Sequence, residues 1–168
     1  YTQRKVWIAL EANPQVSTFC ERPDRLKTDR ETTIDFWVQM AGGTEQAFWI
    51  LNSNAVSPLE EPQASLHGIP IRYLAEETLK SWDVPIANWE RIIPHIVAGR
   101  RHRNALLEQQ IIVLLADFTP LERIKEVFGH HDQAAVLAGL FTLLANGKIL
   151  SPELARHPLC AQTLFRRA

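Results

Sequence analysis

One acidic residue is a candidate for chemistry because of the stretch in which it lies. Asp35 is flanked by β-branched and aromatic residues over Thr32–Val38, a composition typical of a β-strand. A carboxylate buried in such a strand is costly unless a partner compensates its charge. Asp35 therefore pairs with a base such as Arg72, lies exposed at a strand end, or binds a metal ion. The residues alone leave these three interpretations open.

The strongest basic cluster contains Arg100, Arg101 and Arg103. Guanidinium groups clustered in this way can bind DNA phosphates, non-specifically and with strong salt dependence. The alternative is a charged helix junction whose side chains face water, and the two interpretations have equal standing. Arg166 and Arg167 form a weaker pair near the end of the chain, where we expect a mobile segment.

A third polar group, His130 and His131 followed by Asp132, has residue types that bind metals. Adjacent histidines point in different directions, and no third ligand follows at the usual spacing. We therefore predict a turn before a helix that Asp132 caps. Cys20 and Cys160 lie far apart and show no metal-ligand spacing.

The composition indicates an ordinary globular protein. The chain has 168 residues, which fits one or two small domains, with 46% hydrophobic and 22% charged residues. A net charge of −1 gives no general attraction to nucleic acid or membrane, so any DNA contact must come from a local patch. No apolar run approaches the ~18 residues of a membrane span, and we expect a cytoplasmic protein without a membrane partner. Met40 is the single methionine, so we expect residues upstream of Tyr1.

The first half of the chain alternates between helical and strand patterns. Val6 and Leu10 have the i, i+4 spacing of an amphipathic helix, and a Gly-Gly turn separates the two apolar runs of a hairpin. These patterns predict helices over 2–12, 59–66 and 75–82, and strands over 15–20, 32–38, 46–51 and 69–74. The order α-β-β-β-α-β-α is typical of a mixed sheet with helices packed against it.

From residue 83 onward the pattern is mainly helical, which places the boundary between domain 1–82 and domain 83–168. We predict helices over 88–98, 104–116, 119–128 and 133–145, and a short strand over 148–150. Thr119 is the predicted cap of the third of these helices, with Pro120 at its first position. Three short helices followed by a small β element are typical of a winged helix-turn-helix.

The candidate recognition helix of that motif begins after Asp132 and contains neither lysine nor arginine. Base readout usually requires Arg, Lys, Asn or Gln on the exposed face. We therefore favour a packed helix in a scaffolding or protein-binding domain over a helix that reads DNA.

An aspartate on the second strand of an α-β-β-β-α-β order resembles the restriction-endonuclease-like fold. More narrowly, a series of stretches in chain order resembles the TnsA family, the endonuclease subunit of heteromeric cut-and-paste transposases. The resemblance lies in Ile8–Val16, Glu21–Pro23, Ile34–Val38, Gly68–Glu76, Asn88–Pro94 and the C-terminal winged helix.

This resemblance implies an α+β fold, with a restriction-endonuclease-like mixed sheet domain followed by a winged-helix domain. It implies Mg²⁺-dependent cleavage of one strand at transposon ends, with Asp35 as a catalytic residue and metal ligand. The implied partners are the DNA of the transposon ends, a transposase subunit and an AAA+ ATPase regulator.

The sequence departs from the family at the catalytic positions. Gln3 is nearest to the place of the family's metal-binding glutamate, so the implied ligands are Asp35 and Gln3. The family's Glu/Gln-x-Lys should follow on the next strand, but Phe48–Ser53 contains neither carboxylate nor lysine. We therefore expect either a cleaving subunit or a catalytically impaired adaptor that joins transposase and ATPase regulator. The alternative is a stand-alone winged-helix DNA-binding regulator.

Overall fold

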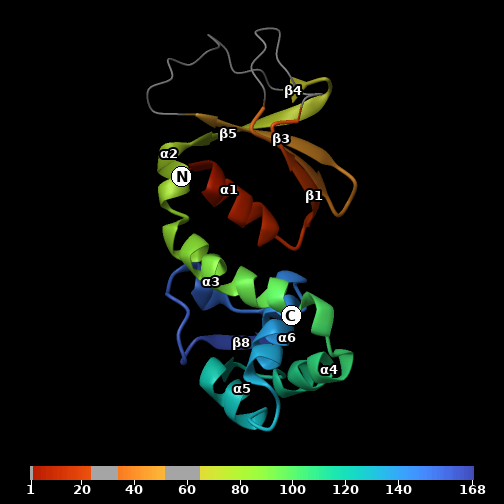
Figure 1. Ribbon diagram of the computed structural model, residues 1–168. Coiled ribbons are helices and arrows are strands. Elements are labelled where there is room, and N and C mark those ends of the chain that lie inside the picture. Colours follow the sequence, from red (N-terminus) through yellow and green to blue (C-terminus); the bar gives the residue numbers. More distant parts are fainter. Residues whose placement is uncertain (1, 24–33, 52–64) are drawn as a thin grey trace. The chain divides into compact units, whose positions relative to one another are not determined.

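A computed structural model describes residues 2–23, 34–51 and 65–168. Contacts divide the chain into two compact units, Tyr1–Trp82 and Asp83–Ala168 (Figure 1). Each unit contains its own β-sheet and its own helices, and the α+β class is confirmed. In the described part of the chain, no helix is both long enough and apolar enough to span a membrane.

The first unit is built around a five-stranded mixed sheet with the strand order β1-β2-β3-β5-β4. Strands β1, β2 and β3 form an antiparallel meander, whereas β5 runs parallel to β3. The elements are α1 (Thr2–Glu11), β1 (Val16–Glu21), β2 (Phe36–Met40), β3 (Glu45–Leu51), β4 (Ser65–Leu66), β5 (Ile69–Ala75) and α2 (Glu76–Lys80).

Alternation along the strands explains why α1 packs on this sheet. Phe36 and Val38 lie two residues apart on β2 and therefore point to the same face. Val6 and Leu10 of α1 are in one hydrophobic cluster with them, as is Leu79 of α2. Figure 1 shows α1 lying along the sheet. The opposite face carries a second cluster, made of Ile34, Ala47, Trp49 and Ile71.

Two boundaries in this unit differ from the predictions. Ser65–Leu66 is strand β4, paired with β5 across a turn in which His67 and Gly68 have positive φ, so the helix predicted over 59–66 is wrong at its end. The positions 59–64 lie outside the described residues. Of the strand predicted over 32–38, positions 32 and 33 lie outside the described residues, and β2 begins at Phe36.

The second unit has a helical core closed by a small sheet with the strand order β6-β8-β7. Its elements are α3 (Asp83–Gly99), the 3-10 helix η1 (Arg100–His102), α4 (Ala105–Leu114), β6 (Thr119–Pro120), α5 (Leu121–Val127), α6 (Gln133–Ala145), β7 (Ile149–Leu150), the 3-10 helix η2 (Pro152–Ala155) and β8 (Leu164–Arg167).

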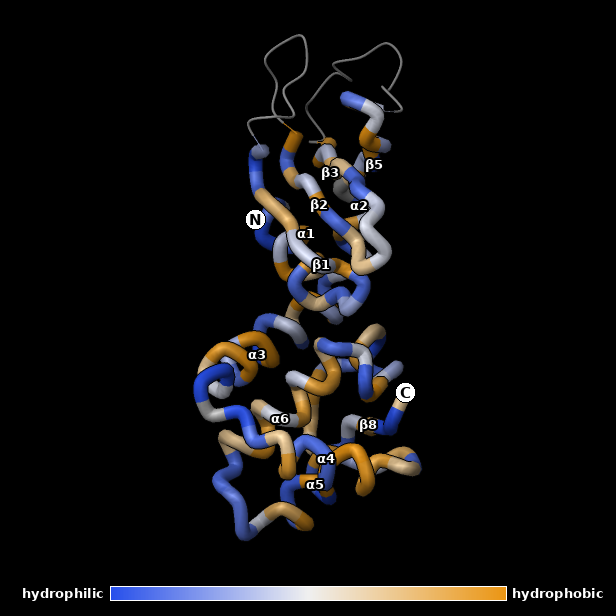
Figure 2. Tube along the Cα trace, turned by 90° about the vertical axis from the view of Figure 1, so that its right-hand side faces the viewer, coloured by the Kyte–Doolittle hydropathy of each residue, from blue (hydrophilic) through white to orange (hydrophobic). Residues whose placement is uncertain are grey.

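Helix α6 is the centre of this unit. Hydrophobic residues run along its length and along α3, where they are drawn in orange in Figure 2. Val136, Leu140 and Phe141 are buried in the main core together with Ile92 of α3 and Phe165 of β8. A helix that is apolar on most sides is buried on most sides.

The start of α5 and the end of the chain differ from the predictions. Thr119 and Pro120 form β6 and pair with β8, so Thr119 does not cap the helix. Its hydroxyl donates to the carbonyl of Asp117 instead, at 3.1 Å. Arg166 and Arg167 lie on β8, the central strand of the small sheet. We expected this end of the chain to be mobile, but its pairing with β7 orders it.

Candidate functional site

Asp35 lies directly before β2, half-buried, and both of its carboxylate oxygens are held. Oδ1 accepts a hydrogen bond from Nε2 of Gln3 at 2.9 Å, and Oδ2 accepts one from the backbone N–H of Ile50 at 2.8 Å. The backbone of Asp35 is held as well, because its carbonyl accepts from the N–H of Arg22 at 2.9 Å. Helix α1 and strand β3 thus fix this carboxylate from two sides.

The structure therefore brings together the two residues that the family resemblance implied as metal ligands. Gln3 contributes from the first turn of α1, and Asp35 contributes from the entry to β2. Their role as ligands, and that of Asp35 in catalysis, stays a prediction. The pairing of Asp35 with Arg72 is wrong, because Gln3 and Ile50 hold the carboxylate, and Arg72 is an exposed residue of β5.

The neighbouring end of β3 supplies no further ligand. Phe36 pairs with Phe48, so the segment beside Asp35 is Trp49–Leu51. Glu45 lies at the opposite end of β3, in register with Gln39. These side chains place neither a carboxylate nor a lysine next to Asp35.

In the described part of the chain, the contacts of Asp35 do not fit a magnesium site. Mg²⁺ prefers hard oxygen ligands with near-octahedral geometry, usually from one or two carboxylates. Here one carboxylate faces an amide that directs its N–H at it rather than its oxygen. In residues 2–23, 34–51 and 65–168, no group of three His, Cys, Asp or Glu side chains could hold a metal ion. The arrangement instead satisfies the charge of Asp35 by hydrogen bonding, as a structural carboxylate requires.

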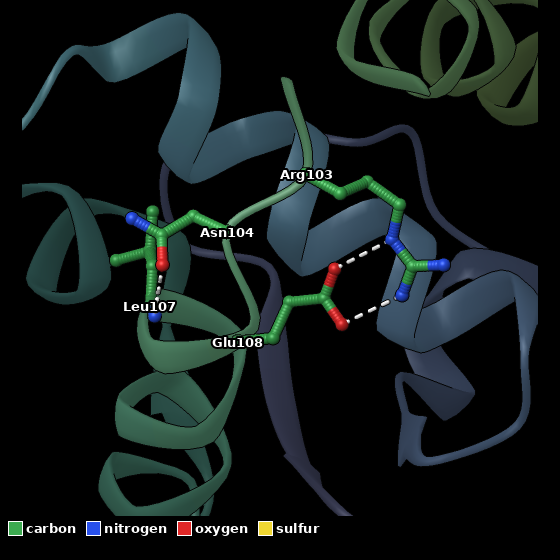
Figure 3. A network of polar contacts seen from close by, with 4 residues as sticks. All are labelled: Arg103, Asn104, Leu107 and Glu108. Atoms are coloured by element: carbon green, nitrogen blue, oxygen red, sulfur yellow. Dashed lines mark hydrogen bonds and ion pairs between the residues drawn. The ribbon is translucent and has the colours of Figure 1, made fainter. Parts of the chain in front are cut away.

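Arg103, which was predicted to contact DNA, has a structural partner. Its guanidinium donates to both carboxylate oxygens of Glu108, at 2.9 Å and 2.7 Å (Figure 3). This hydrogen bonding and the negative charge of Glu108 raise the pKa of Arg103. Glu108 is buried, so the ion pair neutralises a charge at the start of α4. Asn104 completes this helix start by accepting from the backbone N–H of Leu107 at 3.1 Å.

Arg100 and Arg101 lie on η1 and are exposed. Exposed guanidinium groups on one short turn have the chemistry of a phosphate contact. The DNA contact predicted for Arg100, Arg101 and Arg103 stays a prediction.

Helix α6 offers little surface for base recognition. Of its thirteen residues, Ala134 alone is exposed. Asp132 caps the helix as predicted, because Oδ1 accepts from the N–H of Ala134 at 3.0 Å. His130 and His131 contact each other, with ring centroids 4.2 Å apart, in the turn before the cap.

Sequence reasoning missed the role of Asn88 on α3. Its side chain is buried, and Nδ2 donates to the carbonyls of Leu154 and His157 at 2.9 Å and 2.8 Å. Oδ1 accepts from the N–H of Leu159 at 2.7 Å. Asn88 therefore fixes the long segment between β7 and β8 to α3. The signal was a polar residue between apolar positions of an amphipathic helix.

Comparison with known proteins adds no family to this picture. No protein-family model matches the chain, and no curated protein matches it.

Proposed function

We propose that the chain is a TnsA-like subunit of a bacterial DNA transposition complex that acts as an adaptor between a transposase and an AAA+ ATPase regulator. In this proposal the first unit is a restriction-endonuclease-like domain with impaired metal chemistry. The second unit is a winged-helix domain that binds protein.

The topology of the first unit supports this proposal. An antiparallel meander of β1, β2 and β3, followed by β5 parallel to β3, is the arrangement expected of such a sheet. Asp35 lies at the entry to β2, the place that the resemblance gives to the catalytic aspartate.

The second unit supports the winged-helix part of the proposal. Helices α4, α5 and α6 precede the hairpin strands β7 and β8, and β6 lies between α4 and α5. The limited exposure of α6, in which Ala134 alone is fully exposed, favours a protein-binding role over a helix that enters the major groove.

The observation that supports the adaptor role most directly is the hydrogen bonding of the Asp35 carboxylate. Both oxygens accept hydrogen bonds, from Gln3 and Ile50, and the adjacent end of β3 offers apolar side chains. Phosphoryl transfer by metal-dependent nucleases requires carboxylates for the metal and a positive group for the developing charge. Among the described residues, the adjacent end of β3 supplies neither a carboxylate nor a lysine to Asp35, although Glu21 and Arg22 lie beside it at the end of β1.

A nicking assay beside a binding assay tests this proposal. The purified chain and its isosteric variant Asp35→Asn are incubated with labelled transposon-end DNA and Mg²⁺ or Mn²⁺, with and without the cognate transposase. We expect equal background nicking by both proteins and equal binding to transposase and ATPase regulator. Nicking by the unmodified chain that is lost in Asp35→Asn would establish an active endonuclease. Failure of the unmodified chain to bind both the transposase and the ATPase regulator would overturn the adaptor role.

The second candidate is a stand-alone winged-helix DNA-binding regulator, and the exposed Arg100 and Arg101 favour it. Phosphate contacts make binding strongly salt-dependent. A regulator would bind one operator sequence far more tightly than random DNA, and Arg101→Glu would weaken that binding. An adaptor needs no such preference when it is assayed without its partners.

A further inference from the structure

A pocket of about 590 Å³ opens in the second unit between α3, α5, α6 and the segment 159–161. This volume lies within the range of about 300–1,000 Å³ that is typical of small-molecule sites. Part of its lining is apolar, with Leu121 from α5, Leu137 and Phe141 from α6, and Leu159 from the segment 159–161. Phe141 and Leu159 are buried, so this floor is fixed by the core of the unit.

The acidic side chains at the pocket already have partners. Glu122 accepts a hydrogen bond from Nε2 of Gln162 at 2.8 Å. Glu126 forms an ion pair with Arg123 at 3.2 Å along α5. The charge of Glu126 is therefore partly compensated by Arg123, whereas Glu122 is held by a neutral amide.

The basic side chains retain donors that can serve a ligand. Lys125 lines the pocket from α5, and its ammonium group has no partner in the described part of the chain. Arg91 donates through Nη1 to the carbonyl of Leu159 at 2.7 Å, which positions its guanidinium at the pocket while leaving further N–H groups. His95 lies beside them, with its ring 5.6 Å from that of Phe141.

We propose that this pocket binds a small organic anion with an apolar body, of which an aromatic carboxylate is the simplest example. Lys125 and Arg91 supply the positive charge for the anionic group, and a carboxylate matches the guanidinium fork in particular. Phe141 and Leu137 contact the apolar body. This inference concerns the second unit and does not depend on the state of Asp35.

Cys160 provides a reporter at this site. It lines the pocket, its side chain is exposed, and the hydroxyl of Thr163 donates to its sulfur at 3.7 Å. The Thr163 hydroxyl and the backbone N–H of Gln162 lower the pKa of Cys160, which favours the reactive thiolate. Cys20, which is exposed in the first unit, is the internal control.

The experiment measures protection of Cys160 in the full chain. The thiolate attacks one sulfur of the neutral reagent 4,4′-dithiodipyridine, forms a mixed disulfide and releases one thiopyridone, and peptide mass spectrometry follows each cysteine. With 1-naphthoate at twice its dissociation constant, we expect labelling of Cys160 to slow about threefold, from the factor 1 + [L]/Kd. Labelling of Cys20 should not change, and the uncharged analogue 1-naphthamide should protect much less.

A pair of charge-reversed variants tests the role of the positive charge. Lys125→Glu should lose most of the protection by 1-naphthoate, whereas Lys148→Glu, changed at an exposed lysine away from the pocket, should keep it. Equal melting temperatures of the two variants establish that both are folded. Absence of protection by 1-naphthoate, equal protection by 1-naphthamide, or full protection in Lys125→Glu would each overturn the proposal.

Discussion

Gln3 and Asp35 are 32 positions apart in the sequence, yet their side chains form one hydrogen-bonded pair. Gln3 is a neutral donor at the position where the TnsA family, which the sequence resembles, has a metal-binding glutamate. A hydrogen bond to a charged acceptor contributes about 1.5–3 kcal/mol, so the amide stabilises the lone carboxylate without a cation. Gln3 is therefore as informative about function as Asp35 is.

We predict that Gln3→Glu lowers the melting temperature in a buffer containing EDTA. The substitution replaces a donor with a second negative charge beside Asp35, and the repulsion costs on the order of 1–3 kcal/mol. Thermal unfolding followed by circular dichroism measures the effect, and Gln15→Glu, which adds the same charge at an exposed position, is the control. An unchanged melting temperature would mean that the Gln3–Asp35 contact is unimportant in solution.

A second prediction at this scale concerns Arg103 and Glu108. Arg103→Met leaves the buried carboxylate of Glu108 without its partner, and we expect a loss of about 1–3 kcal/mol in the free energy of unfolding. Glu108→Gln in the same chain should restore part of that loss, because it removes the unpaired charge. A double-mutant cycle in urea measures the coupling, and additive effects would contradict a structural role for the pair.

At the scale of elements, the crossing of α3 and α6 depends on a glycine. A Cβ atom placed on Gly99 would collide with the Cβ of Ala138. We predict that Gly99→Ala destabilises the protein by about 1–3 kcal/mol, the usual cost of overpacking. Gly42→Ala is the matched control, because a Cβ at Gly42 meets nothing within 4 Å.

A second substitution, at Ala138, tests whether the collision at the helix crossing causes the destabilisation by Gly99→Ala. In an Ala138→Gly background the collision disappears, and alanine is then preferred to glycine in a helix by up to about 1 kcal/mol. In the Ala138→Gly background, Gly99→Ala should therefore leave the free energy of unfolding unchanged or increase it. Equal destabilisation in both backgrounds would place the cause elsewhere.

The sequence predicted the longer elements well and the short ones poorly. The apolar periodicity of α1, α3, α4 and α6 is sustained over ten or more residues. Helices α1, α4 and α6 lie within two residues of their predicted bounds, whereas α3 begins at Asp83, five residues before the start predicted at 88. The short strand predicted over 148–150 is confirmed as β7, but β6 and β8 were not predicted. Strand β6 has two residues and β8 reads Leu-Phe-Arg-Arg, so their identity depends on partners distant in the sequence. Local propensity carries no such information.

The site was predictable in its residue types and unpredictable in its pairings. Asp35 was evident as a carboxylate in an apolar strand, but its partners depend on how α1 and β3 meet the end of β2. The pocket in the second unit collects residues from four segments, and no local pattern shows that Lys125 and Cys160 line the same space.

At the scale of the whole molecule, we expect the two units, each with its own core, to have different roles. The first unit keeps a sheet on which metal-dependent cleavage could be built, but its aspartate is held by protein hydrogen bonds. The second unit encloses its central helix. Under the adaptor proposal, the chain contributes to an assembly through its surfaces rather than through a catalytic centre.

The most direct test of this account is a titration of the full chain with Mn²⁺, followed by the electron paramagnetic resonance of the free ion. We expect the chain and its Asp35→Asn variant to bind Mn²⁺ equally and weakly, because Asp35 places its carboxylate beside an amide donor. Stoichiometric binding that disappears in Asp35→Asn would contradict it and would establish a metal centre at Asp35.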